Sequence, residues 1–182
     1  YKNKNIHIFK KNFVNEMSSY FKKNHSNIDI SKLIIFHHRE KFYNKTSGMR
    51  GSDLATYNSG IKYLLNKNYS VIRLTHSNAK KLTFKSKKYL EINTDFRKNQ
   101  LLQFYIMSKS KGFICTDSGP SNLAPMFNLP CFESNLPVSN CQGLNKKSIY
   151  ILKKVKLKNK VIPYKKLFKI CLLYTSPSPR DK

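Results

Sequence analysis

The chain has 182 residues, a length that suits one domain with a sizeable core, and its 35 Lys and Arg against 9 Asp and Glu give a formal net charge of +26. No apolar run approaches the roughly 20 residues of a membrane-spanning helix, which excludes such a segment within this sequence. The 4 cysteines contain no C-x-x-C pair, which excludes a disulfide framework or a zinc ribbon and favours buried thiols in a reducing compartment.

Helical and strand-like segments alternate along the chain. Apolar residues at helical spacing predict an amphipathic helix over residues 6–22, with Phe13, Met17 and Phe21 on its apolar face. Short apolar runs predict strands near residues 33–37, 70–74, 88–92, 112–115, 130–133 and 148–152. Between them, helices are predicted over residues 52–68, 100–110 and 120–127. Ser52 is the expected N-cap of the first of these, and residues 153–169 are expected to form a basic helix or tail.

The predicted fold class is α/β, a Rossmann-like parallel sheet with helices on both faces. The strands are continuous apolar runs and do not alternate polar with apolar residues, which is typical of strands buried on both faces. In such sheets ligands bind in the crevice beyond the carboxyl ends of the strands. Residues that directly follow the strands are therefore the candidate site residues.

The strand ends carry residue types that bind anions and sugars. Arg39 follows the first strand, and an arginine fork matches a phosphate bidentately. Thr116, Ser118 and Gly119 follow the strand at 112–115, at the start of a predicted helix whose N–H groups attract negative charge. Two interpretations of this turn remain open. Either a phosphate sits on it, or Ser118 only caps the helix and Gly119 only turns the chain.

Two longer stretches resemble a known family. The stretch "FHHREKFYNKTSGMRGSDLATYNSGIKYLLNKNYSVIRLT" resembles a bacterial glycosyltransferase signature, in which H-x-R-D is followed by R-N-x-D-I-x-x-Y and G-Y-x-V-I-R. The stretch "FICTDSGPSNLAPMFNLPCFESNLP" resembles the serine-glycine turn of the same family, and "DSGPSNLA" is similar to the donor-phosphate turn of heptosyltransferases. The resemblance covers about residues 33 to 155. Glu40 departs from it, since it stands where the family prefers Asp.

The resemblance implies the C-terminal, nucleotide-sugar-binding half of a two-domain GT-B enzyme. It implies that Arg39 neutralises the donor diphosphate and is the catalytic residue. With two strand-end residues added, His38 and Thr116, the expected donor-binding residues are His38, Arg50, Asp53, Arg73, Thr116, Ser118, Gly119 and Asn135. Tyr57 matches the second element of the signature.

Several of these residues also have plain structural interpretations. His38 ends a buried strand and is more often a satisfied core residue. Arg73 lies inside a strand, where it is expected to pair with Asp53 or Glu91. Tyr57 fits the apolar stripe of its helix, and Asp53 suits the first turn of that helix, where it would complement the dipole. No D-x-D pair exists to hold a metal-bound diphosphate, so no metal is expected.

The expected function is metal-independent transfer of a sugar from a nucleotide sugar to a glycan or lipid-linked acceptor, in bacterial cell-surface polysaccharide synthesis. No cofactor is expected, because the nucleotide sugar is a substrate. The expected location is the cytoplasm or the inner face of the membrane, with peripheral membrane association left open. One alternative is the corresponding half of a nucleotide-sugar epimerase. Another is a polyanion-binding or nucleic-acid-binding module, disfavoured because the lysines are scattered and accompany the residues of A/T-rich codons.

The domain organisation expected from the sequence has four parts. Residues 1–31 are expected to be a linker helix from a missing N-terminal half, 32–155 the nucleotide-sugar-binding domain, and 156–170 a basic C-terminal segment. The end of the chain, "CLLYTSPSPRD", resembles a translated sequencing adapter, so residues 171–182 are expected to be non-biological and to pack against nothing.

Overall fold

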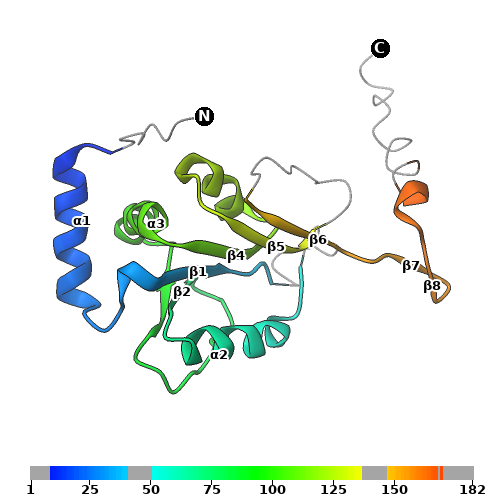
Figure 1. Cartoon of the computed structure of the whole chain (residues 1–182), viewed down its shortest axis with the longest axis horizontal. Coiled ribbons are helices and arrows are strands. Elements are labelled where there is room, and N and C mark those ends of the chain that lie inside the picture. Colours follow the sequence, from blue (N-terminus) through cyan, green and yellow to red (C-terminus); the bar gives the residue numbers. More distant parts are fainter. Residues whose placement is uncertain (1–8, 41–50, 137–146, 168, 170–182) are drawn as a thin grey trace, which may run out of the picture.

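A computed structural model describes residues 9–40, 51–136, 147–167 and 169. The described residues form one six-stranded parallel sheet, flanking helices and a small hairpin (Figure 1). The sheet strands are β1 (Leu33–His37), β2 (Ser70–Thr75), β3 (Tyr89–Asn93), β4 (Gly112–Thr116), β5 (Cys131–Leu136) and β6 (Ile149–Leu152). The helices are α1 (Lys11–Asn24), α2 (Asn58–Asn66) and α3 (Arg97–Lys109), with 3₁₀ helices η1 (Ile30–Lys32), η2 (Leu54–Tyr57) and η3 (Gly119–Phe127).

The strand order is β3-β2-β1-β4-β5-β6, and every neighbouring pair is parallel. The predicted fold class is therefore confirmed, and each predicted strand is present within a few residues of its expected position. The order reverses between β1 and β4, which pair from Ile34↔Gly112 to His37↔Cys115. In open α/β sheets this reversal is where ligands bind.

The two faces of the sheet carry separate cores because successive strand residues point to opposite faces. Leu33 and Ile35 of β1 belong to the core that α1, α3 and η3 cover, and Met17 of α1 packs in the same core. Phe36 belongs to the core beneath α2, together with Ile61. Figure 1 shows α2 on one side of the sheet and α1 and α3 on the other. Cys115 and Cys131 are buried free thiols, as the cysteine spacing predicted.

Two predictions about local structure were wrong. Asp53 and not Ser52 is the N-cap after β1: its carboxylate accepts a hydrogen bond from the Ala55 amide (3.0 Å), and it begins η2, which leads into α2. Residues 153–169 do not form one basic helix or tail, because β7 (Lys156–Leu157) and β8 (Lys160–Val161) pair as an antiparallel hairpin before a helical turn at 164–167. Positive φ angles at Lys158 (44°) and Asn159 (63°) give the two-residue turn that suits a hairpin.

Three expectations fall partly or wholly on residues outside the described ranges. These are the adapter-like tail at 171–182, Arg50, and the start of the helix predicted over residues 6–22. In the ranges that are described, no helix is both long and apolar enough to cross a membrane.

Core packing beneath α3 predicts a sharp contrast between two adjacent leucines. Leu102 is 0% exposed against the sheet, whereas Leu101 is 41% exposed on the same helix. Leu102→Ala should lower the free energy of unfolding by about 2–5 kcal/mol, because it removes buried methyl groups and leaves a cavity. Leu101→Ala is the matched control and should change it by less than about 0.5 kcal/mol. Chemical denaturation measures both, and equal losses would contradict this assignment of the core.

Candidate functional site

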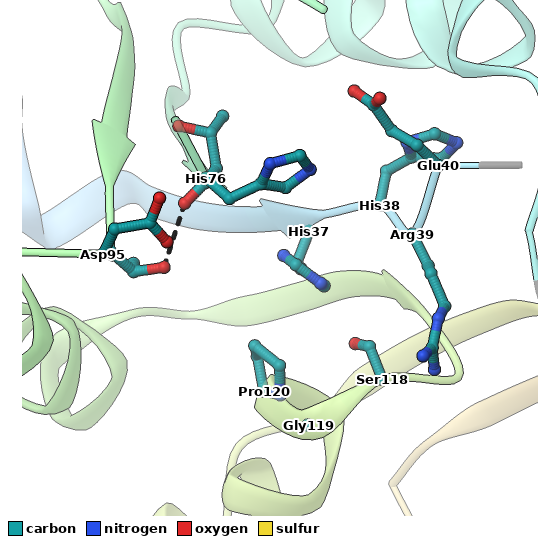
Figure 2. Close-up of a pocket in the computed structure, with 11 residues that line it drawn as sticks. His37, His38, Arg39, Glu40, His76, Asp95, Ser118, Gly119 and Pro120 are labelled. Atoms are coloured by element: carbon teal, nitrogen blue, oxygen red, sulfur yellow. Dashed lines mark hydrogen bonds between the residues drawn. The ribbon is translucent and has the colours of Figure 1, made fainter. Parts of the chain in front are cut away.

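A crevice of about 220 Å³ lies at the carboxyl ends of the strands, where the strand order reverses (Figure 2). It is lined by residues that follow four strands: His37, His38, Arg39 and Glu40 at β1, Thr75 and His76 at β2, Thr94 and Asp95 at β3, and Ser118, Gly119 and Pro120 at β4. The expectation that Arg39, Ser118 and Gly119 converge on one crevice is confirmed. Parallel strands put these ends on one edge although 77 residues separate Arg39 from Thr116 at the end of β4.

Arg39 is anchored through its backbone on two sides. Its amide donates to Oγ1 of Thr116 (2.8 Å), which is fully buried at the end of β4, and its carbonyl accepts from the amide of Ser52 (3.3 Å). Figure 2 shows its side chain extending toward the turn that carries Ser118. Its Nε is buried and has no hydrogen-bond partner. Thr116 therefore contributes by holding Arg39, and it does not itself line the crevice.

Ser118 is the N-cap of η3 and stands opposite Ser121 in a capping-box arrangement, although its side chain makes no cap hydrogen bond. Ser118 is 4% exposed, yet its Oγ has no hydrogen-bond partner. The Ser121 hydroxyl makes the turn's bonds instead, donating to the Ser118 carbonyl (2.7 Å) and accepting from the Ser118 amide (3.3 Å). Gly119 has no positive φ, and a Cβ built on it would meet nothing within 4 Å. A strained turn thus does not account for Gly119, whereas Ser118 occupies the N-cap position without a hydrogen bond to its hydroxyl, and a ligand of the turn remains a prediction.

Two histidines on the crevice wall are neutral at pH 7. His37 donates from Nδ1 to the Leu74 carbonyl (3.1 Å), and His38 donates from Nε2 to the Ser52 carbonyl (2.8 Å). Burial lowers the pKa of His37 to about 4, although its hydrogen bond to Leu74 works in the opposite direction. Burial likewise lowers the pKa of His38. Nδ1 of His38 is buried without a partner, so this residue is only half satisfied as a core histidine.

Asp95 supplies a negative charge on the wall away from Arg39. Its carboxylate accepts from the hydroxyl (2.6 Å) and the amide (2.7 Å) of Ser77, and these bonds lower the pKa of Asp95, so that it stays ionised. Reasoning from sequence missed Asp95. It also omitted His37, Glu40, Thr75, His76 and Thr94 from the predicted site. The sequence feature that could have identified them is the one that identified Arg39, because each of these residues ends or follows a predicted strand.

Other predicted site residues lie away from the crevice or outside the described chain. Arg73 is 1% exposed and pairs with Glu91 (2.8 Å), as its plain interpretation anticipated. Asp53 caps η2, and Asn135 donates to the Tyr57 hydroxyl (3.0 Å) beside a separate hollow of about 340 Å³. Arg50 is not described. Among the described residues, no group of three or more His, Cys, Asp or Glu could hold a metal ion.

Two solved structures from Escherichia coli share this fold. ADP-heptose LPS heptosyltransferase II matches with a TM-score of 0.57 at 13% sequence identity, over 83% of this chain and 45% of its own. Heptosyltransferase WaaC, solved with ADP, matches with a TM-score of 0.54 at 12% identity, over 86% of this chain and 48% of its own. No protein-family model matches the chain, and no curated protein sequence is significantly similar to it.

These similarities concern the fold. The chain spans less than half the length of each heptosyltransferase, and it has the Rossmann-like architecture expected for one half of a GT-B enzyme. At this level of identity, the similarity does not transfer individual residue roles.

The orphaned hydroxyl of Ser118 predicts an unusual stability result. Ser118→Ala should leave the free energy of unfolding unchanged or raise it slightly, because an unsatisfied buried hydroxyl is removed. Ser121→Ala is the matched control and should lower it by about 1 kcal/mol, because this hydroxyl does bond to the backbone. Urea denaturation measures both. If Ser118→Ala lowers the free energy of unfolding by about 1 kcal/mol, the Ser118 hydroxyl makes a capping hydrogen bond after all.

The neutral state of His37 predicts how stability depends on pH. Its folded pKa of about 4 lies below the ordinary value of 6.5, so the unfolded chain binds more protons between these values. The contribution of His37 is therefore present above pH 6.5 and is lost as the pH falls toward 4. His37→Asn, which keeps a donor near the Leu74 carbonyl, should lose less stability over this range than the wild type. Identical pH profiles from thermal denaturation would refute the assignment.

Proposed function

We propose that the crevice binds the diphosphate of a nucleotide sugar, and that the chain is the donor-binding part of a glycosyltransferase. The observation that carries this proposal is the buried hydroxyl of Ser118, which lacks a partner and shares the crevice with Arg39 at the point where the strand order reverses. An unsatisfied buried hydroxyl costs free energy that a bound acceptor oxygen would recover. A phosphate oxygen is such an acceptor.

The charge distribution supports an anionic ligand with a polar, uncharged end. Arg39 offers a planar donor fork on one side, and the Gly119 N–H at the start of η3 adds partial positive charge beside Ser118. On the wall away from Arg39, the ionised Asp95 would repel a second phosphate but accept hydrogen bonds from hydroxyl groups. A diphosphate joined to a sugar or ribose has this combination of groups.

In the proposed mechanism, Arg39 and Ser118 stabilise the diphosphate as it leaves. Breaking the bond between the sugar and the diphosphate develops negative charge on the departing oxygens. Donors held in place before the reaction stabilise this charge without reorganising. Thr116 keeps Arg39 in position through the backbone amide. The catalytic base, and the residues that bind the glycan or lipid-linked acceptor, would lie outside the described residues. The proposed transfer needs no metal ion and serves the synthesis of bacterial polysaccharides.

Calorimetric titration of the 182-residue chain with ADP, UDP and GDP, in buffer containing a chelator, tests the proposal. At least one nucleoside diphosphate should bind, and Arg39→Ala should weaken that binding about ten- to a hundred-fold, because hydrogen bonds to charged groups contribute about 1.5–3 kcal/mol. Arg39→Lys should also weaken it, since a point charge cannot reproduce the planar fork.

Lys62→Gln is the control for net charge. Lys62 is an exposed residue of α2 outside the crevice, so this variant should bind as the wild type does. If Lys62→Gln and Arg39→Ala weaken binding equally, the interaction is a general attraction to a basic surface. If no nucleoside diphosphate binds the wild type, the proposed function is wrong.

A further inference from the structure

Arg73 is a buried cation that does not itself line the crevice. It lies in β2, is 1% exposed, and occupies the same face of the sheet as Val71, beneath α2. Its Nη1 donates to Glu91 (2.8 Å) and to the Lys80 carbonyl (2.6 Å), and its Nη2 lies 3.7 Å from the Glu40 carboxylate. A charge this deeply buried is tolerated only when it is paired and hydrogen-bonded.

Glu40 connects this cation to the segment that carries Arg39. It directly follows Arg39, and its Oε1 accepts a hydrogen bond from the Lys80 amide (2.7 Å) while facing Arg73. Its backbone also forms a parallel bridge with Ser52. The residue after Arg39 is thus tied to the connection between β2 and β3 and to the segment before η2.

Arg39 therefore lies between two anchors. On the β4 side its amide bonds to Thr116, and on the β2 side the next residue is held by Arg73 and by the Lys80 amide. Removing Arg73 would leave Glu40 and Glu91 without their shared counter-ion. Glu40 would then turn toward water, and the Arg39 segment would lose one of its two anchors.

We propose that Arg73 is a positioning residue: through Glu40 it holds Arg39 in the orientation that faces Ser118, and it does not contact the ligand. The effect of Arg73 on ligand binding rests on the proposed function, whereas the anchoring of Arg39 is a property of the free chain. The positioning role reassigns Arg73 from a donor contact to the counter-ion of the acid that follows Arg39. It also explains why that position carries a carboxylate.

Hydrogen exchange in the free chain tests the anchoring without any ligand. Arg73→Met should speed exchange of the Arg39 and Lys80 amides relative to amides of α3. The Arg39 segment would lose an anchor, and the Lys80 amide would lose its ordered acceptor, the Glu40 carboxylate. Glu40→Gln removes only the negative charge that pairs with Arg73, and it does so at a partly exposed side chain that should tolerate the change. This variant therefore decides the test if Arg73→Met does not fold. Arg97→Met, at an exposed arginine at the start of α3, is the matched control. Unchanged exchange at Arg39 in both Arg73→Met and Glu40→Gln would overturn the inference.

A double-mutant cycle with the nucleoside diphosphate that binds best, among ADP, UDP and GDP, separates positioning from direct contact. Arg73→Met should weaken binding about tenfold in the wild type, but less than about twofold when Arg39 is already Ala, because its effect acts through Arg39. If Arg73 only stabilises the fold, Arg73→Met should lower the free energy of unfolding, and its effect on binding should not depend on Arg39. Equal weakening in both backgrounds would show that Arg73 acts on the ligand independently of Arg39, and would overturn the inference. If no nucleoside diphosphate binds the wild type, the proposed function fails, and the exchange rate at Arg39 alone decides whether Arg73 positions this segment.

Discussion

The pairing of β1 with β4 is the constraint on which the candidate site depends. It brings His37 opposite Cys115, so the residues that follow these strands leave the sheet side by side. The hydrogen bond from the Arg39 amide to Oγ1 of Thr116 then joins the two strand ends directly. Without this pairing, Arg39 and Ser118 would be unrelated polar residues on distant parts of the sequence. With it, a fork of donors and an unpartnered hydroxyl face the same crevice.

Electrostatics inside this crevice differ from those of the chain as a whole. The sequence is strongly basic, with only 9 acidic residues, yet Glu40, Glu91 and Asp95 all lie on β3 or at the ends of β1 and β3. Glu40 and Glu91 neutralise Arg73, and Glu40 and Asp95 both line the crevice. The total charge therefore says little about the crevice, because local pairing decides which cations are neutralised.

The fold similarity and the local chemistry are independent observations. The two heptosyltransferases share the architecture at 12–13% identity, a level at which packing and topology persist while side chains change. The Ser118 hydroxyl, Nδ1 of His38 and Nε of Arg39 are buried in this chain without a hydrogen-bond partner. All three are polar atoms of crevice-lining residues without a protein partner. Unsatisfied buried groups are rare in folded proteins, and each needs an explanation such as strain, water or a bound ion.

The sequence by itself determined the α/β class and the positions of the six strands of the parallel sheet, because continuous apolar runs between helical segments have few other solutions. It also predicted that Arg39, Ser118 and Gly119 lie in one crevice, since residues after parallel strands share one edge whatever the strand order. It could not decide between Asp53 and Glu91 as the partner of Arg73, choose Asp53 over Ser52 as the cap, or find Asp95. Those outcomes depend on strand order and on side-chain geometry across the sheet. Arg73 meets Glu91 because β2 lies beside β3, and in the turn before η3 it is the Ser121 hydroxyl and not the Ser118 hydroxyl that bonds to the backbone. Such competition between nearby donors and acceptors is decided only when the chain is folded.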